Sequence, residues 1–305
     1  MAFDSIFRPG LFAGQTHIVT GGGSGIGRCT AHELAHLGAT VVLVGRRLER
    51  LEQVQREIAD AGGHALTFAG DHRDEERVRD VVRGVLDATG RIDGLVNNAG
   101  GQFAAPLASI TKKGWEAVIA NCLTGGFLCA RECYTQWMVD HGGAIVNIVA
   151  DMWGSMAGMG HSGAARAGMV SFTETAAFEW SGSGVRVNAV APGAIASAGF
   201  ETYPDWMQPF LKKTHAAIPL ARLGTEAEVS AAIVFLLSPA AAFISGTVVR
   251  VDGAAPNARL SSPLSALRDP QEPSPLPWPL DVHDRAPVWN GFPLGRRSAR
   301  WDDPA

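Results

Sequence analysis

The sequence has no apolar run near the ~18 residues that a membrane-spanning helix needs, and its first residues lack a charged segment followed by an apolar core. We therefore expect no membrane span and no signal peptide, which favours a cytoplasmic protein. The net charge is −4, and the sequence shows no basic patch or run of like charge. Nucleic acid is thus not an expected partner.

Cysteine is scarce, with four residues in the chain: Cys29, Cys122, Cys129 and Cys133. We expect buried free thiols in a reducing compartment rather than disulfides or metal ligands. Residues 32–36 read H-E-L-A-H, which matches the zinc-protease pattern H-E-x-x-H. One face of that helix must pack on a sheet and no third ligand is evident, so no metal site is predicted.

Short apolar runs alternate with helical patterns down to about residue 253. Continuously apolar strands are typical of a sheet that is buried on both faces. The alternation predicts an α/β fold with a doubly wound, Rossmann-type parallel sheet and helices on both faces. About seven strands are expected, at residues 16–20, 40–44, 65–69, 94–97, 144–149, 185–191 and 247–251.

Residues 20–27 read T-G-G-G-S-G-I-G, between the first strand and a helix predicted over residues 26–37. A strand that ends in a glycine-rich turn and opens a helix is typical of a pyrophosphate site, because the helix N-terminus presents free N–H groups. Gly21 permits the tight turn, Gly25 allows the backbone to approach the ligand, and Gly27 allows close helix packing. Ser24 and Ile26 complete the predicted cofactor-binding turn.

The second strand ends at Arg46 and Arg47, where a carboxylate would bind a ribose 2′-hydroxyl. Guanidinium groups suit a 2′-phosphate by charge and by geometry. This favours NADPH/NADP+ over the NAD pair. The alternative is that both arginines form the solvated start of a helix.

The spacing of this turn resembles the classical short-chain dehydrogenase/reductase family, and further motifs carry the resemblance across residues 14–253. It implies that N-N-A-G at residues 97–100 lines the adenosine side and that Asp71 binds the adenine amino group. It also implies that P-G at residues 192–193 lies beside the nicotinamide and that Asn121 supports a water-mediated proton relay. The implied cofactor residues are Asn98, Ala99, Gly100, Asp71, Pro192, Gly193, Ile195 and Ser197.

The chain departs from the family pattern at the catalytic positions. Where most members have serine, tyrosine and lysine, this chain has Val149, Ser162 and Arg166. Its two tyrosines, Tyr134 and Tyr203, fit neither place. A serine hydroxyl without an adjacent base is a poor proton donor, and arginine cannot give up a proton. Arg166 can still hold the ribose hydroxyls.

The stretch H-S-G-A-A-R-A-G at residues 161–168 resembles the peroxisomal trans-2-enoyl-CoA reductase branch of this family, as do N-N-A-G-G-Q-F at 97–103, K-G-W at 113–115 and L-T-G at 123–125. The resemblance implies NADPH-dependent reduction of a 2-enoyl thioester. A tyrosine proposed as the acid in that branch is Val170 here.

Enoyl reduction develops charge on a thioester oxygen, which needs hydrogen-bond donors rather than full proton transfer. Ser162 is the expected donor, with His161 beside it, and water near Asn121 would protonate the carbon. Asp151 is an alternative proton donor, or a carboxylate that caps its loop.

The predicted domains are an N-terminal arm (1–13), the catalytic domain (14–253) and a Pro-rich extension (254–305), which is either disordered or docked. An apolar segment at 199–223 is expected to cover a lipid-like or acyl-CoA substrate, and a homo-oligomer (dimer or tetramer) is expected from the resemblance. Two alternatives stay open: a dehydrogenase of isoprenoid or other apolar alcohols and aldehydes, of the citronellol/citronellal type, and a catalytically degenerate NADP(H)-binding sensor or non-catalytic subunit.

Overall fold

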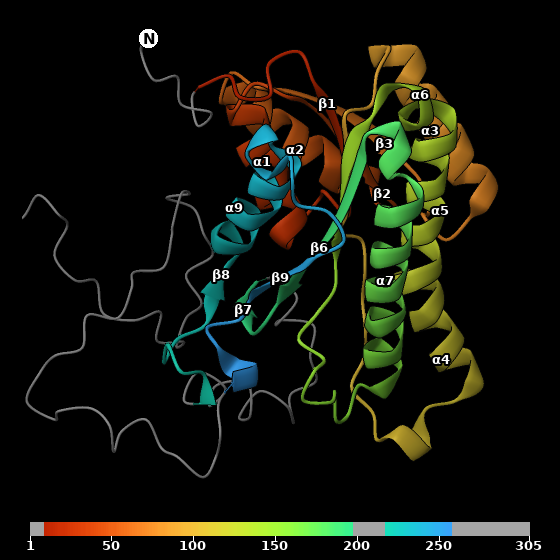
Figure 1. Cartoon of the computed structure of the whole chain (residues 1–305), viewed down its shortest axis with the longest axis vertical. Helices are drawn as coiled ribbons and strands as arrows, with labels where there is room; N and C mark the ends of the chain where they lie inside the picture. The colour runs from red at the N-terminus through yellow and green to blue at the C-terminus, as the bar shows by residue number, and fades with distance from the viewer. Residues whose placement is uncertain (1–8, 198–216, 258–305) are drawn as a thin grey trace, which may run out of the picture.

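The computed structural model of the chain describes residues 9–197 and 217–257. Its centre is a seven-stranded parallel sheet with the order β3-β2-β1-β4-β5-β6-β9 (Figure 1). This confirms the predicted doubly wound α/β fold. The strands are β1 (Thr16–Thr20), β2 (Thr40–Gly45), β3 (His64–Ala69), β4 (Gly94–Asn97), β5 (Gly143–Ile148), β6 (Val185–Pro192) and β9 (Val248–Val251).

Helices cover both faces of the sheet (Figure 1). One face packs against α1 (Gly25–His36), α2 (Leu48–Asp60) and α9 (Glu226–Leu237), and the other against α3 (Glu75–Thr89), α5 (Gly125–Cys133) and α7 (Gly160–Glu179). The remaining described elements are η1 (Leu107–Ser109), α4 (Lys112–Ile119), η2 (Ala120–Thr124), η3 (Tyr134–Met138), α6 (Val139–His141), η4 (Ser181–Ser183), β7 (Ile195–Ala196), β8 (Gly224–Thr225), η7 (Pro239–Ala241) and η8 (Ala255–Asn257).

The sheet order reverses at β1, which lies between β2 and β4. In doubly wound sheets, the crossovers on the two sides of such a point diverge and leave a crevice at the carboxyl ends of the strands. The fold therefore places the glycine-rich turn after β1 beside the loop after β4.

One predicted helix, residues 113–140, is not a regular α-helix. The chain stays helical, but α4 passes into the π-helical segment η2, and α5 passes into a second one, η3. A π-turn accommodates an extra residue without a break, so no proline or glycine signal marks it in the sequence. The next long helix, α7, begins at Gly160, three residues before its predicted start at 163.

The domain boundaries stay a prediction. Residues 1–8, 198–216 and 258–305 lie outside the described residues, and they include most of the predicted substrate cover at 199–223. Phe12 is buried, and its backbone N–H donates to the Leu37 carbonyl at 3.0 Å.

The four cysteines are buried and free, as predicted. No helix in residues 9–197 or 217–257 has the length and apolar character needed to cross a membrane.

Candidate active site

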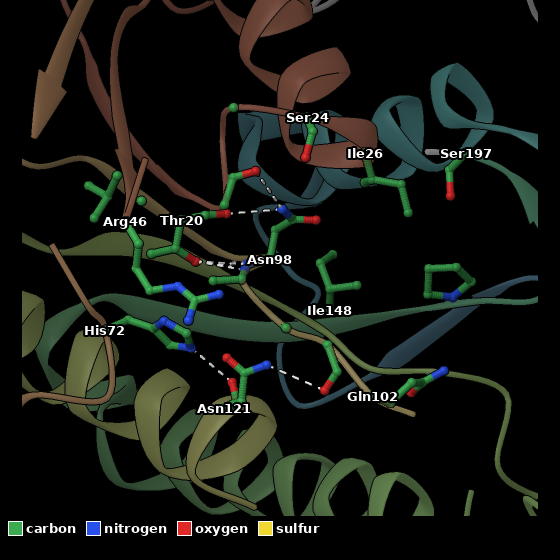
Figure 2. A pocket seen from close by; sticks show the side chains of 18 of the residues that line it. Thr20, Ser24, Ile26, Arg46, His72, Asn98, Gln102, Asn121, Ile148 and Ser197 are labelled. Atoms are coloured by element: carbon green, nitrogen blue, oxygen red, sulfur yellow. Dashed lines mark hydrogen bonds between the residues drawn. The ribbon is translucent and has the colours of Figure 1, made fainter. Parts of the chain in front are cut away.

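A cavity of about 510 Å³ lies at the carboxyl ends of β1, β2, β4, β5 and β6. Most residues predicted to form the site line it: Gly21, Ser24, Ile26, Arg46, Arg47, Asn98, Ala99, Gly100, Asn121, Arg166, Pro192, Gly193, Ile195 and Ser197. Five predicted residues are not among its described lining: Gly25, Gly27, Asp71, His161 and Ser162. Figure 2 shows Ser24 and Ile26 on one side, with His72, Asn121 and Gln102 along the other.

The glycine-rich turn has the backbone that only glycine adopts readily. Gly21 has φ +66° and Gly25 has φ +59°. A Cβ on Gly21 would approach the Asn98 amide nitrogen to 2.9 Å and the Ala99 Cα to 3.0 Å. A Cβ on Gly27 would collide with the Asn98 amide and the Gly21 carbonyl. Gly25 and Gly27 therefore shape the turn from behind the cavity, Gly27 against Asn98 and the turn itself.

Thr20 and Asn98 lock this turn to the loop after β4. Thr20 Oγ1 accepts hydrogen bonds from the Asn98 and Ala99 backbone N–H groups, both at 3.0 Å, and donates to the Val96 carbonyl at 3.1 Å. The Asn98 side-chain amide donates to the Thr20 carbonyl at 3.0 Å. Helix α1 follows with Ser24 at its N-cap, whose side chain makes no capping bond. Its first N–H groups are thus available to an anion.

Positive charge dominates the cavity. Four of its described lining residues carry a guanidinium group and none carries a carboxylate. Arg46, Arg47 and Arg50 follow β2, and Arg166 comes from α7. Arg47 is the N-cap of α2, so its backbone begins that helix while its side chain lines the cavity.

Asp71 and His72 follow β3. The Asp71 carboxylate accepts hydrogen bonds from Arg73 Nη2 at 2.5 Å and Nε at 2.9 Å, and these bonds hold the pKa of Asp71 well below its usual range. His72 Nε2 donates to the backbone carbonyl of Asn121 at 2.9 Å. Burial lowers the pKa of His72, although this hydrogen bond and the Asp71 charge oppose the shift.

Asn121 lies in the π-helical segment η2, and its side chain enters the cavity (Figure 2). Its Nδ2 donates to the Gly101 carbonyl at 3.3 Å, and Cys122 Sγ contacts the same carbonyl at 3.4 Å. π-turns occur frequently at functional sites because they re-aim side chains out of the regular helical pattern.

The early start of α7 places His161 and Ser162 in its first turn, where both are fully buried. Ser162 Oγ donates a hydrogen bond to Gln102 Oε1, and Gln102 lines the cavity. The His161 ring packs edge-on against Phe103, with centroids 4.4 Å apart. Neither ring nitrogen of His161 has a hydrogen-bond partner among the described residues.

The stretches G-Q-F and H-S therefore meet in space, although they lie about 60 residues apart in the chain. Arg166 lies one turn further along α7, and its Nη1 donates to the Ile148 carbonyl at the end of β5. A Cβ on Gly100 would approach Arg166 Nη2 to 2.8 Å, so a larger residue there would displace the end of that guanidinium group. Ser162 thus contacts a lining residue, Gln102, whereas Arg166 lines the cavity itself.

No tyrosine lines the described part of the cavity. Tyr134 stacks on Trp180 with centroids 4.3 Å apart, and its hydroxyl lies 3.1 Å from Ser183 Oγ. Tyr203 lies outside the described residues. Asp151 follows Ala150, which lines the cavity, and its backbone N–H donates to the Pro192 carbonyl at 3.2 Å. Burial, and then the negative charge of Asp252, raises the pKa of Asp151.

The H-E-x-x-H stretch has a structural partner. His32 Nε2 lies 3.1 Å from Glu57 Oε2, and the same carboxylate oxygen accepts from Arg28 Nε at 2.7 Å. Across residues 9–197 and 217–257, no group of three or more His, Cys, Asp or Glu side chains could hold a metal ion.

Among the lining residues that were not predicted as site residues, Gln102, His72 and Arg50 have long or ring-bearing polar side chains. Gln102 stood inside the motif N-N-A-G-G-Q-F, so a signal for it existed. Arg50 lies in the first turn of α2, four residues after Arg46. Nothing in the local sequence indicates that the ring of His72 turns toward Asn121.

Comparison with known proteins defines the family. Residues 21–254 match the family described as enoyl-(acyl carrier protein) reductase. A Bacillus subtilis (strain 168) protein that carries the name probable 2,4-dienoyl-CoA reductase, (2E)-enoyl-CoA-producing, is 39% identical over 239 residues, which cover 77% of this chain and 94% of that one. The chain therefore belongs to the short-chain dehydrogenase/reductase family of oxidoreductases, whose cofactor is NAD(P).

Solved structures agree with this membership. The citronellol catabolism dehydrogenase of Pseudomonas aeruginosa PAO1 is 60% identical, with a TM-score of 0.74, covering 83% of this chain and 99% of that one. A gluconate 5-dehydrogenase candidate from Beutenbergia cavernae, whose structure holds NADP at low occupancy, is 35% identical, with a TM-score of 0.76, covering 82% and 100%.

Proposed function

We propose that this chain is an NADP(H)-dependent oxidoreductase of an apolar, isoprenoid-type substrate, related in its reaction to the citronellol dehydrogenase. The observation that carries the proposal is the 60% identity to that enzyme, which extends over 99% of its length. The sequence motifs favoured enoyl-thioester reduction first and the isoprenoid dehydrogenase second. The comparisons support the reverse order.

The residues present fit a dinucleotide. The Gly21 turn is a cradle in which a Cβ has no room, and α1 begins beside it with Ser24 and Ile26 in the cavity lining. The free N–H groups of a helix start suit a phosphate. Arg46, Arg47 and Arg50 would hold a 2′-phosphate, because guanidinium groups bind phosphate through paired N–H donors. The cofactor, when bound, would supply or accept the hydride.

The end of the cavity near β5 would receive the nicotinamide side of the cofactor and, next to it, the substrate. Arg166 would hold the ribose hydroxyls of the cofactor there. Ser162 donates to the oxygen of the Gln102 amide, and we assign the N–H₂ group of the same amide as a donor to an oxygen of the substrate. A donor oriented in advance stabilises charge that develops on a carbonyl oxygen.

Oxidation of an alcohol also needs a group that accepts a proton. We assign this role to Asp151, whose pKa is raised by burial and by the charge of Asp252, the direction that a general base requires. Its chain neighbour Ala150 and its hydrogen-bond partner Pro192 both line the cavity.

A second function, reduction of a 2-enoyl thioester, is favoured by one observation. The position of the family tyrosine holds Ser162, which is buried and bonded to Gln102 rather than exposed as an acid. Enoyl reduction needs stabilisation of a thioester oxygen more than an acid at that place. The 39% identity to the dienoyl-CoA reductase supports the same reaction class.

A substrate panel with purified protein separates these functions. NADP+-dependent oxidation of citronellol, or NADPH-dependent reduction of citronellal, supports the first proposal. If only trans-2-enoyl-CoA or 2,4-dienoyl-CoA oxidises NADPH, the dehydrogenase proposal is overturned in favour of enoyl-thioester reduction. Binding of NADPH without turnover on the whole panel overturns both and leaves a non-catalytic role.

One substitution sharpens the assay. The dehydrogenase function predicts that Asp151→Asn lowers kcat on the alcohol about 100-fold, the usual contribution of a general base. Enoyl reduction through Gln102 and Ser162 predicts little change in the same variant. Asp140→Asn, at an exposed position in α6, is the matched control.

A further inference from the structure

His72 has no role in the family motifs, yet it lines the cavity beside Arg46 (Figure 2). It follows β3 in the loop that leads to α3, and only 9% of the residue is exposed. A buried histidine of this kind needs a partner for at least one ring nitrogen.

That partner belongs to another part of the chain. His72 Nε2 lies 2.9 Å from the backbone carbonyl oxygen of Asn121, 49 residues further along. Because a carbonyl only accepts, Nε2 carries the hydrogen and donates it. The bond is made to the π-helical segment η2 from outside the helix.

The packing around the ring is specific. Gly125 is the first residue of α5, and a Cβ on it would collide with the His72 ring and approach the His72 carbonyl oxygen to 3.0 Å. The ring therefore packs against the backbone at the end of η2, and a larger residue at position 125 would displace it. The position of the His72 ring thus depends on glycine at position 125.

The contact continues toward the substrate end. Asn121 Nδ2 donates to the Gly101 carbonyl at 3.3 Å, and Gly101 directly precedes Gln102, which is bonded to Ser162. Figure 2 shows His72, Asn121 and Gln102 in a row along one side of the cavity, with dashed lines for the two hydrogen bonds of Asn121. A displacement of η2 would thus be felt at the amide of Gln102.

We propose that His72 is a positioning residue that holds the η2 turn, so that Asn121 and Gln102 keep their places in the cavity. The proposal rests on the proposed function only in taking these two amides as the groups that act on the substrate end. Its effect is on orientation, and His72 itself contacts no reacting atom.

The test compares His72→Leu, which removes the donor, with His72→Gln, whose Nε2–H can reach the same carbonyl. His64→Leu, at an exposed histidine that begins β3, is the control. Three quantities are measured on the full chain: hydrogen–deuterium exchange of residues 118–126, the NADPH dissociation constant, and kcat and KM on the substrate found in the panel.

We expect His72→Leu to speed exchange in residues 118–126 about 10-fold and to lower kcat about 10-fold, because small misplacements of catalytic groups are costly. KM and the NADPH dissociation constant stay within about twofold, and His72→Gln and His64→Leu behave like the wild type.

Unchanged exchange and unchanged kcat in His72→Leu overturn the proposal. Equal damage from His72→Gln also overturns it, because the hydrogen bond is then not what matters. If no substrate of the panel is turned over, the proposed function fails, while the exchange data still decide the role of His72.

Discussion

The two ends of the cavity differ in whether backbone or side chains form them. The end after β1 and β2 is made largely of backbone, with the Gly21 turn clamped by Thr20 and Asn98. The end after β5 is made of side chains: Ser162 and Arg166 occupy the positions of the tyrosine and lysine of most family members, and Ser162 is bonded to Gln102.

This difference explains which parts of the site can be inferred from a resemblance to the family. A backbone cradle depends on the absence of side chains, so its sequence pattern cannot change without losing the shape. A set of side-chain donors can be rebuilt from other residue types that present a similar N–H or O–H. The cofactor end is therefore readable from motifs, and the chemistry at the substrate end is not.

The largest effect is expected where a side chain enters the cradle. Gly27→Val would force the Asn98 amide away from the turn, and overpacking of this kind costs about 3 kcal/mol. NADPH affinity measured by fluorescence titration should fall more than about 100-fold. Gly182→Val is the control, since a Cβ there meets nothing within 4 Å. Retained affinity in Gly27→Val would show that the cradle tolerates side chains.

Gln102→Leu tests the other end. Loss of one preoriented donor should lower kcat about 100-fold, while NADPH affinity stays unchanged because Gln102 is remote from the turn. Gln53→Leu, on the exposed face of α2, controls for the change of residue type. A fall in NADPH affinity equal to the fall in kcat would mean that the two ends are not separate.

Arg46→Glu tests which dinucleotide the cofactor end accepts. Replacing one charged partner of a 2′-phosphate should weaken NADPH binding about 50-fold, or about 2.3 kcal/mol, and leave NADH binding unchanged or improved. Arg56→Glu, at an exposed position on α2, is the control. An equal loss for NADPH and NADH would remove the argument for NADP(H).

A smaller effect is expected on stability as pH falls. Burial lowers the pKa of His17, in β1, to about 4, against an ordinary value of about 6.5. The unfolded chain then binds more protons between these values, so the free energy of unfolding falls as the pH drops through this window. The contribution between pH 7 and pH 5 is about 2 kcal/mol.

Urea unfolding at pH 7 and pH 5 measures this contribution. The fall in the wild type should exceed that in His17→Gln by about 2 kcal/mol. His64→Gln, with an exposed ring, should behave like the wild type. The same pH dependence in His17→Gln would place the titrating group elsewhere.

Much of the fold could be predicted from sequence, because continuous apolar strands and alternating helices leave few arrangements open. All seven predicted strands occur within a residue or two of their expected bounds. The prediction of one regular helix over residues 113–140 missed its two π-helical segments, because a π-turn keeps helical residue types and apolar spacing.

The candidate site was predictable where it depends on one local stretch. The contacts of Ser162 with Gln102 and of His72 with Asn121 join residues about 50 to 60 positions apart, and no local periodicity reports such pairs. Ser162 was predicted as the donor to the substrate. Its hydrogen bond to Gln102 favours a role in orienting that amide, and both roles stay predictions. The predicted oligomer stays a prediction.

The most direct test is a double-mutant cycle on kcat with Gln102→Leu and Ser162→Ala. If Ser162 acts through Gln102, the single variants should lose about 100-fold and about 10-fold, and the double variant should lose no more than Gln102→Leu alone. A double variant that loses about 1,000-fold, the product of independent effects, would contradict this account, as would full activity in Ser162→Ala.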